Sequence, residues 1–414
     1  MICFVLAYSY LCYMGKAGGH KKKTTDRPRR VSWLGALLLL VTGIVPLGLV
    51  GTFLCGYIPP GRFGITSLLG LAFPWLVLAS AALGIVYLFF FKKRCLIFFA
   101  AILLNFHNLG LLVRLPHNDR TRRDDNRMTS ATRPSEFKVL SYNVCLFGYY
   151  AQQDDRNGRK DRIAAYVGVE EADILCLQEY YESKDQRFRI RETLRKAGYR
   201  HHTRLQENAR FYFGNAVFSR FPILRQDTVP GLSPIDALYA DLQLPGGDTL
   251  RVYTFHLASL RFDDHDKALY HELLNKPLDE SVSYKAEAGK IARKVSRAAR
   301  IHAGQVRQIK AHAATCPYRL LICGDMNENP VSYAYHTLGK GLKDAFMERG
   351  VGLGRTYSGF FPAYRIDYIF YRAALDRATG KVSDQTDARL ETLHFEVGAV
   401  DYSDHRPITA IMHY

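Results

Sequence analysis

The sequence lacks the spacing patterns that mark several common kinds of functional site. Its eight cysteines are scattered, with no two of them three residues apart, so neither a zinc site nor a dithiol redox centre is indicated. Cys176 and Cys323 lie inside apolar runs, where a free cysteine usually acts as a small buried hydrophobe. A glycine-rich loop of the nucleotide-binding type is absent. No serine or cysteine stands in a setting typical of a catalytic nucleophile.

Acidic residues are scarce in the first third of the chain. Residues 1–135 carry 17 Lys and Arg against 4 Asp and Glu, whereas residues 136–414 carry 39 against 35. The formal net charge of +17 therefore comes mainly from the N-terminal third. Because this excess flanks apolar segments, it is typical of the cytoplasmic side of a membrane protein rather than of a nucleic-acid-binding surface.

Three uncharged runs follow a basic cytoplasmic segment, residues 1–30, and predict a membrane region over residues 31–115. They are Val31–Ile58, Phe63–Phe91 and Cys95–Val113. A spanning helix needs about 20 apolar residues, so about three transmembrane helices are expected. Asn105 and two neighbouring polar residues weaken the third run, for which an interfacial helix is the alternative. The basic residues place the N-terminus inside, and three spans then carry the rest of the chain to the outer side.

Residues 116–136 are polar and predict a linker, and residues 137–414 predict a soluble domain of alternating strands and helices. The expected strands are 138–144, 174–179, 215–219, 237–241, 250–256, 320–323, 366–371 and 408–412. Helices are expected at 162–171 and 284–314. The second helix is strongly basic, which indicates a solvated face, or alternatively a surface that rests on anionic lipid or substrate.

Several of the expected strands end in a polar and often acidic side chain. These ends carry Asn143, Glu179, His256, the pair Asp325 and Asn327, and Asp404 with His405 ahead of the last strand. A further carboxylate, Asp367, lies inside an expected strand, where burial is costly unless the group is paired, so we expect a histidine partner. Carboxylates and amides of this kind suit a hard cation such as Mg²⁺ rather than zinc.

Seven short motifs occur in an order that resembles the endonuclease/exonuclease/phosphatase superfamily. They are SYN at 141–143, LQE at 177–179, NAVFSRFPI at 215–223, FHLAS at 255–259, GDMN at 324–327, RIDYIF at 365–370 and SDHRP at 403–407. This superfamily includes pancreatic-type DNase, abasic-site endonucleases, neutral sphingomyelinases and inositol-polyphosphate 5-phosphatases. The resemblance covers roughly residues 137–414. It implies an α/β fold, a four-layered sandwich of two packed mixed β-sheets flanked by helices, here preceded by the three transmembrane helices.

The resemblance also implies a metal site and a water-activating pair. Glu179 would be the principal ligand of Mg²⁺, with Mn²⁺ as a possible substitute. Asn143 would bind metal or phosphate beside it, and Asp404 would approach the metal. Asp325 would accept a proton from the attacking water or orient it, and Asn327 would hold that water or a phosphate oxygen.

The remaining motif residues would bind the phosphoryl group, by the same resemblance. His405 would donate hydrogen bonds to the phosphoryl oxygens, and Asp367 would orient its imidazole and keep it charged. His256 would meet the phosphate from the other side, and Asn215 would help to position it. A phosphodiester is anionic, so these donors and the metal would neutralise charge while water attacks in line.

The sequence thus predicts a membrane-anchored, Mg²⁺-dependent phosphoesterase that hydrolyses phosphodiester bonds. The substrate would be nucleic acid or a lipid headgroup, as in a nuclease or a phospholipid or sphingomyelin phosphodiesterase, and the choice stays open. The lipid bilayer is the other expected partner, and no protein partner is inferable. The resemblance to bacterial membrane-anchored members implies the inner membrane, with the catalytic domain on the periplasmic side. The alternative is a non-catalytic membrane scaffold that keeps the fold for binding.

Overall fold

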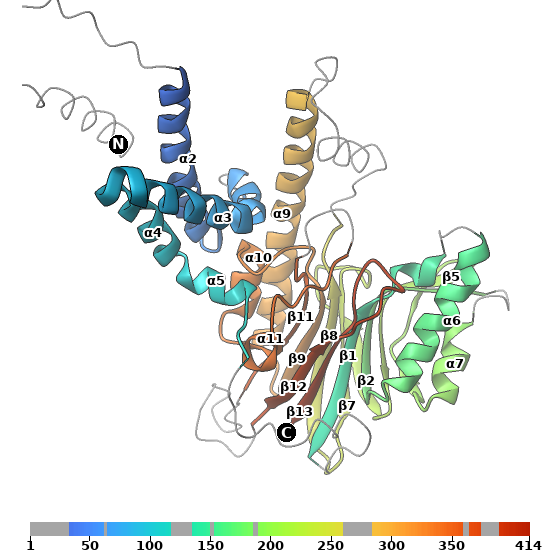
Figure 1. Cartoon of the computed structure of the whole chain (residues 1–414). Helices are drawn as coiled ribbons and strands as arrows, with labels where there is room; N and C mark the ends of the chain where they lie inside the picture. Colours follow the sequence, from blue (N-terminus) through green and yellow to red (C-terminus); the bar gives the residue numbers. More distant parts are fainter. Residues whose placement is uncertain are drawn as a thin grey trace, which may run out of the picture. The chain divides into compact units, whose positions relative to one another are not determined.

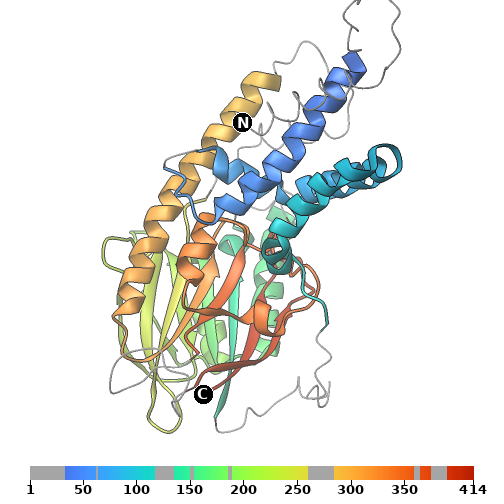
Figure 2. The same ribbon diagram turned by 90° about the vertical axis from the view of Figure 1, so that its left-hand side faces the viewer.

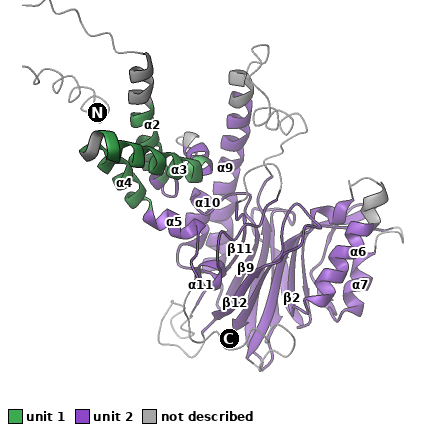
Figure 3. Cartoon of the chain, in the orientation of Figure 1, with its two compact units in different colours: residues 1–52, 72–105 green, residues 53–71, 106–414 purple. Residues whose placement is uncertain are grey.

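The computed structural model describes residues 33–61, 64–116, 135–149, 153–184, 189–259, 284–358, 364–373 and 389–414. The chain divides into two compact units, which are coloured separately in Figure 3. One unit holds residues 1–52 and 72–105, and the other holds residues 53–71 and 106–414. The expected basic segment 1–30 and most of the expected linker lie outside the described residues.

The N-terminal third is helical. Its elements are α2 (Trp33–Cys55), α3 (Ile65–Phe91), η1 (Lys92–Arg94), α4 (Cys95–Leu104) and α5 (Phe106–Leu112). Within the described residues only one helix, Thr66–Phe90, is long and apolar enough to cross a membrane. The apolar stretch Val41–Cys55 of α2 is shorter, and α4 with α5 would count as a second span only as a bent pair. The prediction of three transmembrane helices was therefore wrong.

The third apolar run is broken at Asn105, where α4 and α5 meet at 59°. The buried Asn105 amide donates to the backbone oxygens of Leu49 at 2.8 Å and Ala101 at 3.1 Å. Its oxygen accepts a hydrogen bond from the Thr52 hydroxyl at 3.1 Å. A side-chain amide that bonds to backbone carbonyls offers the chain an alternative to the helical ladder. One buried polar side chain therefore replaces a continuous span with two short helices.

The C-terminal part contains two mixed β-sheets. The first has seven strands in the order β12-β13-β1-β2-β5-β3, with β4 paired to β5. Its strands are β1 (Glu136–Asn143), β2 (Ile174–Ser183), β3 (His201–His202), β4 (Gln206–Glu207), β5 (Phe211–Ser219), β12 (Glu391–Val397) and β13 (Ile408–His413). The second has six strands in the order β10-β11-β9-β8-β7-β6. Its strands are β6 (Ile223–Thr228), β7 (Ala237–Gln243), β8 (Thr249–His256), β9 (Arg319–Asp325), β10 (Lys343–Asp344) and β11 (Asp367–Tyr371).

Helices cover the outer faces of the two sheets, as Figures 1 and 2 show. The helices of this part are η3 (Cys145–Gly148), α6 (Gln153–Val169), α7 (Ile190–Lys196), α9 (Tyr284–Ala314), α10 (Tyr333–Gly339) and α11 (Ala345–Arg349). Apolar residues of both sheets, such as Val139 and Val252, form the central core. Two outer cores join α6 and α7 to the first sheet, and α9 and α10 to the second. The predicted four-layered α/β sandwich of two mixed sheets is confirmed.

Candidate active site

The polar strand ends meet at one edge of the sandwich because of the strand registers. In the second sheet β8 runs parallel to β9, which places His256 opposite Asp325. The strand β11 runs antiparallel to β9 and begins where β9 ends, so Asp367 also lies opposite Asp325. In the first sheet β1 and β2 are parallel and bring Asn143 and Glu179 to the same edge.

Asp325 is the centre of the cluster and is fully buried. Its Oδ2 atom accepts a hydrogen bond from Asn143 Nδ2 at 3.0 Å, and the Nε2 atoms of His256 and His405 each lie 3.5 Å from it. Its Oδ1 atom accepts the backbone N–H of Asn327 at 2.8 Å. Burial raises the pKa of Asp325, while the two histidines oppose that rise. A carboxylate with this environment is suited to accept a proton near neutral pH.

His405 forms a buried pair with Asp367, so the aspartate has the histidine partner that burial requires. The distance from His405 Nδ1 to Asp367 Oδ2 is 2.9 Å. Burial alone would lower the pKa of His405, but Asp367 and Asp325 outweigh it and raise this pKa to about 10. The imidazole is therefore cationic at neutral pH. The Thr356 hydroxyl accepts the backbone N–H of Asp367 at 3.2 Å, and the Tyr357 ring lies edge-on, 5.2 Å from the His405 ring.

Glu179 reaches the cluster through an irregularity in β2. The register between β2 and β5 shifts between Leu177 and Tyr180, and Glu179 has a φ of +50°. A bulge of this kind re-aims a side chain, and a non-glycine residue in this region stores strain that is common at functional sites. The Glu179 carboxylate lies 3.6 Å from His256 Nε2 and 3.5 Å from Asn143 Nδ2, and its side chain is 30 % exposed.

Asp404 lies on the same side of the cluster as Glu179. Burial raises the pKa of the Cys145 thiol, and the carboxylates of Asp404 and Glu179 raise it further, so both acids lie near this thiol. The Ser403 hydroxyl links the two elements, since it donates to the Asn143 backbone oxygen at 2.8 Å and contacts Asp404 Oδ1 at 3.2 Å. Carboxylate oxygens are ligands that a hard divalent cation prefers.

The Asn143 amide is turned away from the orientation that metal ligation requires. Its Oδ1 atom accepts the backbone N–H of Cys145 at 3.0 Å, so its nitrogen faces Asp325 and Glu179. In this orientation Asn143 acts as a donor to both carboxylates. Direct coordination of a metal by Asn143 would require the amide to rotate.

Asp325, Asp367 and His405 form a second group close enough to hold a metal ion, with ligand atoms within 4.8 Å of one another. Both ring nitrogens of His405 face carboxylate oxygens, however, and the ring is protonated at neutral pH. A protonated imidazole has no lone pair to offer a metal. This group is therefore poorly suited to a cation.

Two further expected site residues contact neighbouring loops. Asn327, with a φ of +54°, donates from its side chain to the Leu257 backbone oxygen at 2.9 Å. This bond ties the loop after β9 to the loop after β8. Asn215 is buried in β5 and donates to the Ile235 backbone oxygen at 2.6 Å, and no described contact joins its side chain to Asp325.

A buried histidine of α9 connects the same two loops and was not predicted from the sequence. His302 Nδ1 lies 2.8 Å from Glu328 Oε1, and Nε2 lies 2.6 Å from the Ala258 backbone oxygen. Gln305, one turn further, accepts the Ala258 N–H at 3.1 Å and donates to Asp236 Oδ1 at 2.8 Å. The sequence signal was weak, because a histidine in a basic helix resembles any surface residue until the packing of that helix is known.

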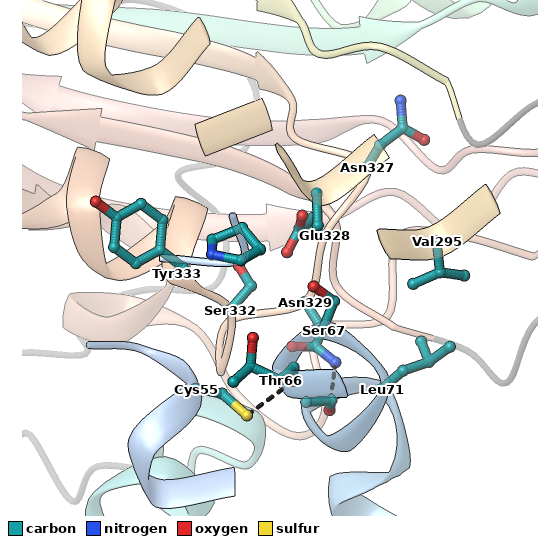
Figure 4. A pocket seen from close by; sticks show the side chains of 13 residues that line it. Cys55, Thr66, Ser67, Leu71, Val295, Asn327, Glu328, Asn329, Ser332 and Tyr333 are labelled. Carbon is teal, nitrogen blue, oxygen red and sulfur yellow. Dashed lines mark hydrogen bonds between the residues drawn. The ribbon is translucent and has the colours of Figure 1, made fainter. Parts of the chain in front are cut away.

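A cavity lies beside the loop that follows β9 (Figure 4). Asn327, Glu328 and Ser332 line it from the loop after β9, and Ser67 and Leu71 line it from the start of α3. One of the lining residues, Asn329, donates to the Gly70 backbone oxygen at 2.9 Å. The Tyr364 hydroxyl donates to the Leu71 backbone oxygen. The first turns of α3 are therefore bonded to the loop that carries Asn327.

Protein-family models match both the C-terminal and the N-terminal part of the chain. A model described as the endonuclease/exonuclease/phosphatase family matches residues 140–405, and a domain of unknown function matches residues 35–111. Among curated proteins none matches this chain.

Solved structures with a similar fold include a D. rerio TDP2 humanized by 14 mutations. It is 17 % identical with a TM-score of 0.45, and the match covers 68 % of this chain and 100 % of that one. An endonuclease/exonuclease/phosphatase from Beutenbergia cavernae is 18 % identical with a TM-score of 0.45, covering 67 % and 72 %. The 3′ phosphatase NExo from Neisseria, bound to a product DNA hairpin, is 17 % identical with a TM-score of 0.44, covering 66 % and 98 %.

Proposed function

The chain belongs to the endonuclease/exonuclease/phosphatase family, and from this premise we propose that it is a membrane-anchored, Mg²⁺-dependent phosphoesterase that hydrolyses phosphodiester bonds. The observation that carries the proposal is the single cluster in which a buried carboxylate, Asp325, faces two histidines and two amide groups. Such a cluster combines a proton acceptor with cationic and neutral donors, which attack on an anionic phosphodiester requires.

Glu179 and Asp404, with Asn143 beside them, would hold the metal ion. When bound there, Mg²⁺ would supply positive charge to the phosphate oxygens and help to orient substrate. The two carboxylates suit this role because they supply oxygen ligands and Glu179 is partly open to solvent, whereas Asn143 would coordinate the ion only after its amide rotates. The nitrogens of His256 and His405 would remain available for the substrate.

Asp325 would accept the proton of the attacking water or orient that water. Its raised pKa, caused mainly by burial, supports such a role. Asn327 would hold the water or a phosphate oxygen from the loop that follows β9. The short contact between the Asn327 backbone and Asp325 Oδ1 fixes one oxygen of the carboxylate. The other oxygen, Oδ2, faces the remaining site groups.

The Nε2–H group of His405 would donate a hydrogen bond to a phosphoryl oxygen as negative charge develops there. Asp367 orients the ring through Nδ1 and keeps it cationic, which leaves Nε2 as the donor toward substrate. His256 would bind the phosphate from the opposite side. Asn215 would help to position it, acting from β5 behind the cluster.

The apolar helix Thr66–Phe90 supports the anchoring part of the proposal. We place the domain 137–414 on the outer side of a bacterial inner membrane, because the basic residues of segment 1–30 favour a cytoplasmic N-terminus. One transmembrane helix, like three, places the segments before and after it on opposite sides of the membrane. Extraction of membranes with sodium carbonate should leave the chain in the pellet. Release by carbonate or by high salt would contradict the anchor.

The catalytic proposal is tested on the full chain purified in detergent, with a generic chromogenic phosphodiester. Turnover should be abolished by EDTA, restored by Mg²⁺ and absent in Asp325→Asn. Turnover that survives both EDTA and Asp325→Asn would contradict the proposal. A protein that binds phosphodiesters without hydrolysing any of them, across plasmid DNA, RNA and phospholipid vesicles, would instead be the non-catalytic scaffold.

A further inference from the structure

The helix α9 has two faces of opposite character. One face is buried and includes Val295, Ala299, His302, Val306 and Ile309, of which Val306 and Ile309 pack in the core of the second sheet. Its members recur every three or four residues, as expected for one side of a helix. Because His302 contacts the loops after β8 and β9, this buried face also holds the candidate active site.

The opposite face of α9 is a stripe of cations. It consists of Lys290, Arg293, Lys294, Arg297, Arg300 and Arg307, of which all but the partly buried Lys294 are exposed. The spacing of three, four and seven residues keeps these side chains on one side of the helix. The sequence contains no Asp or Glu from residue 288 to residue 324, so no acidic residue of α9 interrupts the stripe. We call these six residues the α9 stripe.

The N-terminal half of α9, which carries most of the α9 stripe, lies beside the start of the apolar helix α3. The Ser296 hydroxyl, within the stripe region of α9, donates to the Gly64 backbone oxygen at 2.9 Å. Val295 and Ala299 line one cavity together with Ser67 and Leu71 of α3 (Figure 4). The N-terminal half of α9 is therefore attached to the point at which the apolar helix begins.

The start of α3 is expected at headgroup level when the helix is in a bilayer. The candidate span has 25 residues, which at 1.5 Å per residue is longer than a hydrocarbon core of about 30 Å. Its first turn begins with the polar residues Thr66 and Ser67, and the apolar residues follow from Leu68. The first turn is thus suited to the interface, and the adjoining part of α9 would lie at the same depth.

We propose that the α9 stripe is a docking surface for the anionic phospholipid headgroups of the membrane that holds α3. Exposed Arg and Lys side chains pair with headgroup phosphates, and Arg does so through two parallel hydrogen bonds. A helix docked in this way would hold the loops after β8 and β9 over the bilayer surface through His302. The inference rests on the anchoring part of the proposed function and not on catalysis.

A nucleic-acid backbone offers similar phosphates, and the position of the stripe favours lipid over it. A nucleic-acid surface has no need to begin at an apolar helix, whereas a lipid-docking surface must lie at the depth of the headgroups. An experiment that supplies anionic lipid and nucleic acid separately distinguishes the two partners.

The test is hydrogen–deuterium exchange of the full chain in nanodiscs of phosphatidylcholine alone or mixed with phosphatidylglycerol. Backbone amides of residues 289–308 should exchange several-fold more slowly in the anionic discs. Molar salt should remove the difference, because the Debye length then falls to about 3 Å. Equal exchange in the two lipids would overturn the proposal. So would slowing by a DNA duplex in phosphatidylcholine discs that exceeds the slowing by anionic lipid.

The triple variant Arg293→Gln, Arg297→Gln and Arg300→Gln should lose the lipid-dependent slowing. A matched control, Lys196→Gln, Arg200→Gln and Arg225→Gln, removes the same charge from exposed positions on other elements and should retain it. Loss in both variants would point to net charge rather than to this face and would contradict the assignment. The salt dependence of the unaltered chain decides the question if the triple variant fails to fold. Failure of phosphodiester turnover is a separate result, because exchange is measured without substrate.

Discussion

At the scale of single residues, the two buried aspartates of the candidate site differ in the groups that face them. Asp367 is paired with a cationic ring, whereas Asp325 shares its oxygens among neutral amides and two more distant imidazoles. The raised pKa of Asp325 follows mainly from its burial. Two aspartates 42 residues apart on neighbouring strands are therefore expected to have different roles.

Glu179→Gln should weaken metal affinity as well as rate, because the amide keeps the shape of the side chain and loses its charge. His405→Ala should leave the Mg²⁺ dependence nearly intact and lower turnover on the order of 10²-fold, as expected for loss of a transition-state donor. Rates measured across a Mg²⁺ titration separate the two effects. Glu207→Gln, an exposed carboxylate on β4, is the control and should change neither quantity. Unchanged metal affinity in Glu179→Gln would remove Glu179 from the metal site.

Asp367→Asn should act as a weaker lesion of the same kind as His405→Ala, because the ring remains but loses the charge that orients it. The double variant of Asp367→Asn with His405→Ala should be little worse than His405→Ala alone, since residues that act as a unit have non-additive effects. Steady-state rates of the two single variants and the double variant test this. Full additivity would show that the pair does not act together.

At the scale of elements, β8 and β9 lie close together at Gly324. This residue has a φ of +155°, and a Cβ atom placed there would lie 2.0 Å from the Phe255 backbone oxygen. The close approach sets the parallel register that pairs His256 with Asp325. The glycine is therefore a structural requirement of the site as well as a turn residue.

Gly324→Ala should destabilise the fold by roughly 1–3 kcal/mol or more, because the clash is with backbone that cannot move aside without shifting β8. Gly304→Ala in α9 is the matched control. Nothing lies within 4 Å of its Cβ position, and alanine favours a helix by about 1 kcal/mol. Thermal unfolding of the detergent-solubilised chain should show a lower midpoint only for Gly324→Ala. Equal midpoints would mean that β8 accommodates the methyl group.

Five strands were not predicted: the two-residue strands β3, β4 and β10, and the longer strands β6 and β12, which are poor in the pattern that marks a buried strand. The strand β6 has exposed polar residues at its centre, and β12 alternates buried and exposed positions with charges at two of the exposed ones. Each lies at an edge of its sheet. Their pairing partners supply the stability that their own composition does not indicate.

At the scale of the whole molecule, the segment 53–71 is packed against the α/β sandwich of the same unit, and His336 of α10 lies at that contact. A Cβ atom on Gly56 would come within 2.4 Å of the His336 ring, and the Tyr57 ring lies 5.6 Å from it. Burial, together with the nearby His107, lowers the pKa of His336 to about 4. Protonation of this ring would therefore place a charge in a poorly solvated contact.

The stability of the chain should fall in acid because of His336. Its unfolded pKa is about 6.5, so between pH 6.5 and 4 the unfolded state binds more protons than the folded state. The contribution is fully present above pH 6.5 and is lost as the pH falls through about 4, by up to about 3 kcal/mol at 1.4 kcal/mol per pKa unit.

His336→Gln should reduce the drop in unfolding midpoint between pH 7 and pH 4.5, whereas His413→Gln, at the exposed end of β13, should leave it unchanged. Thermal scans at the two pH values make the comparison. An undiminished drop in His336→Gln would assign the acid sensitivity to other groups.

The sequence by itself determined which side chains gather at the site, because that depends on local order. Each of Asn143, His256 and Asp325 ends an apolar run, and strands of such runs present their ends at one edge of a sheet. The expected burial of Asp367 likewise predicted a partner for it in any fold, because an unpaired buried charge is costly. These inferences need only burial, strand period and charge.

Only the tertiary structure decided the direction of Glu179, the place of His302 and the number of apolar helices. The bulge that turns Glu179 inward arises from pairing with β5, and His302 becomes a link between two loops only when α9 packs on the second sheet. Asn105 ends a helix through hydrogen bonds to Leu49 and Thr52, which lie more than 50 residues earlier in the chain. Hydropathy along the chain reports composition, whereas each of these features is a contact between distant segments.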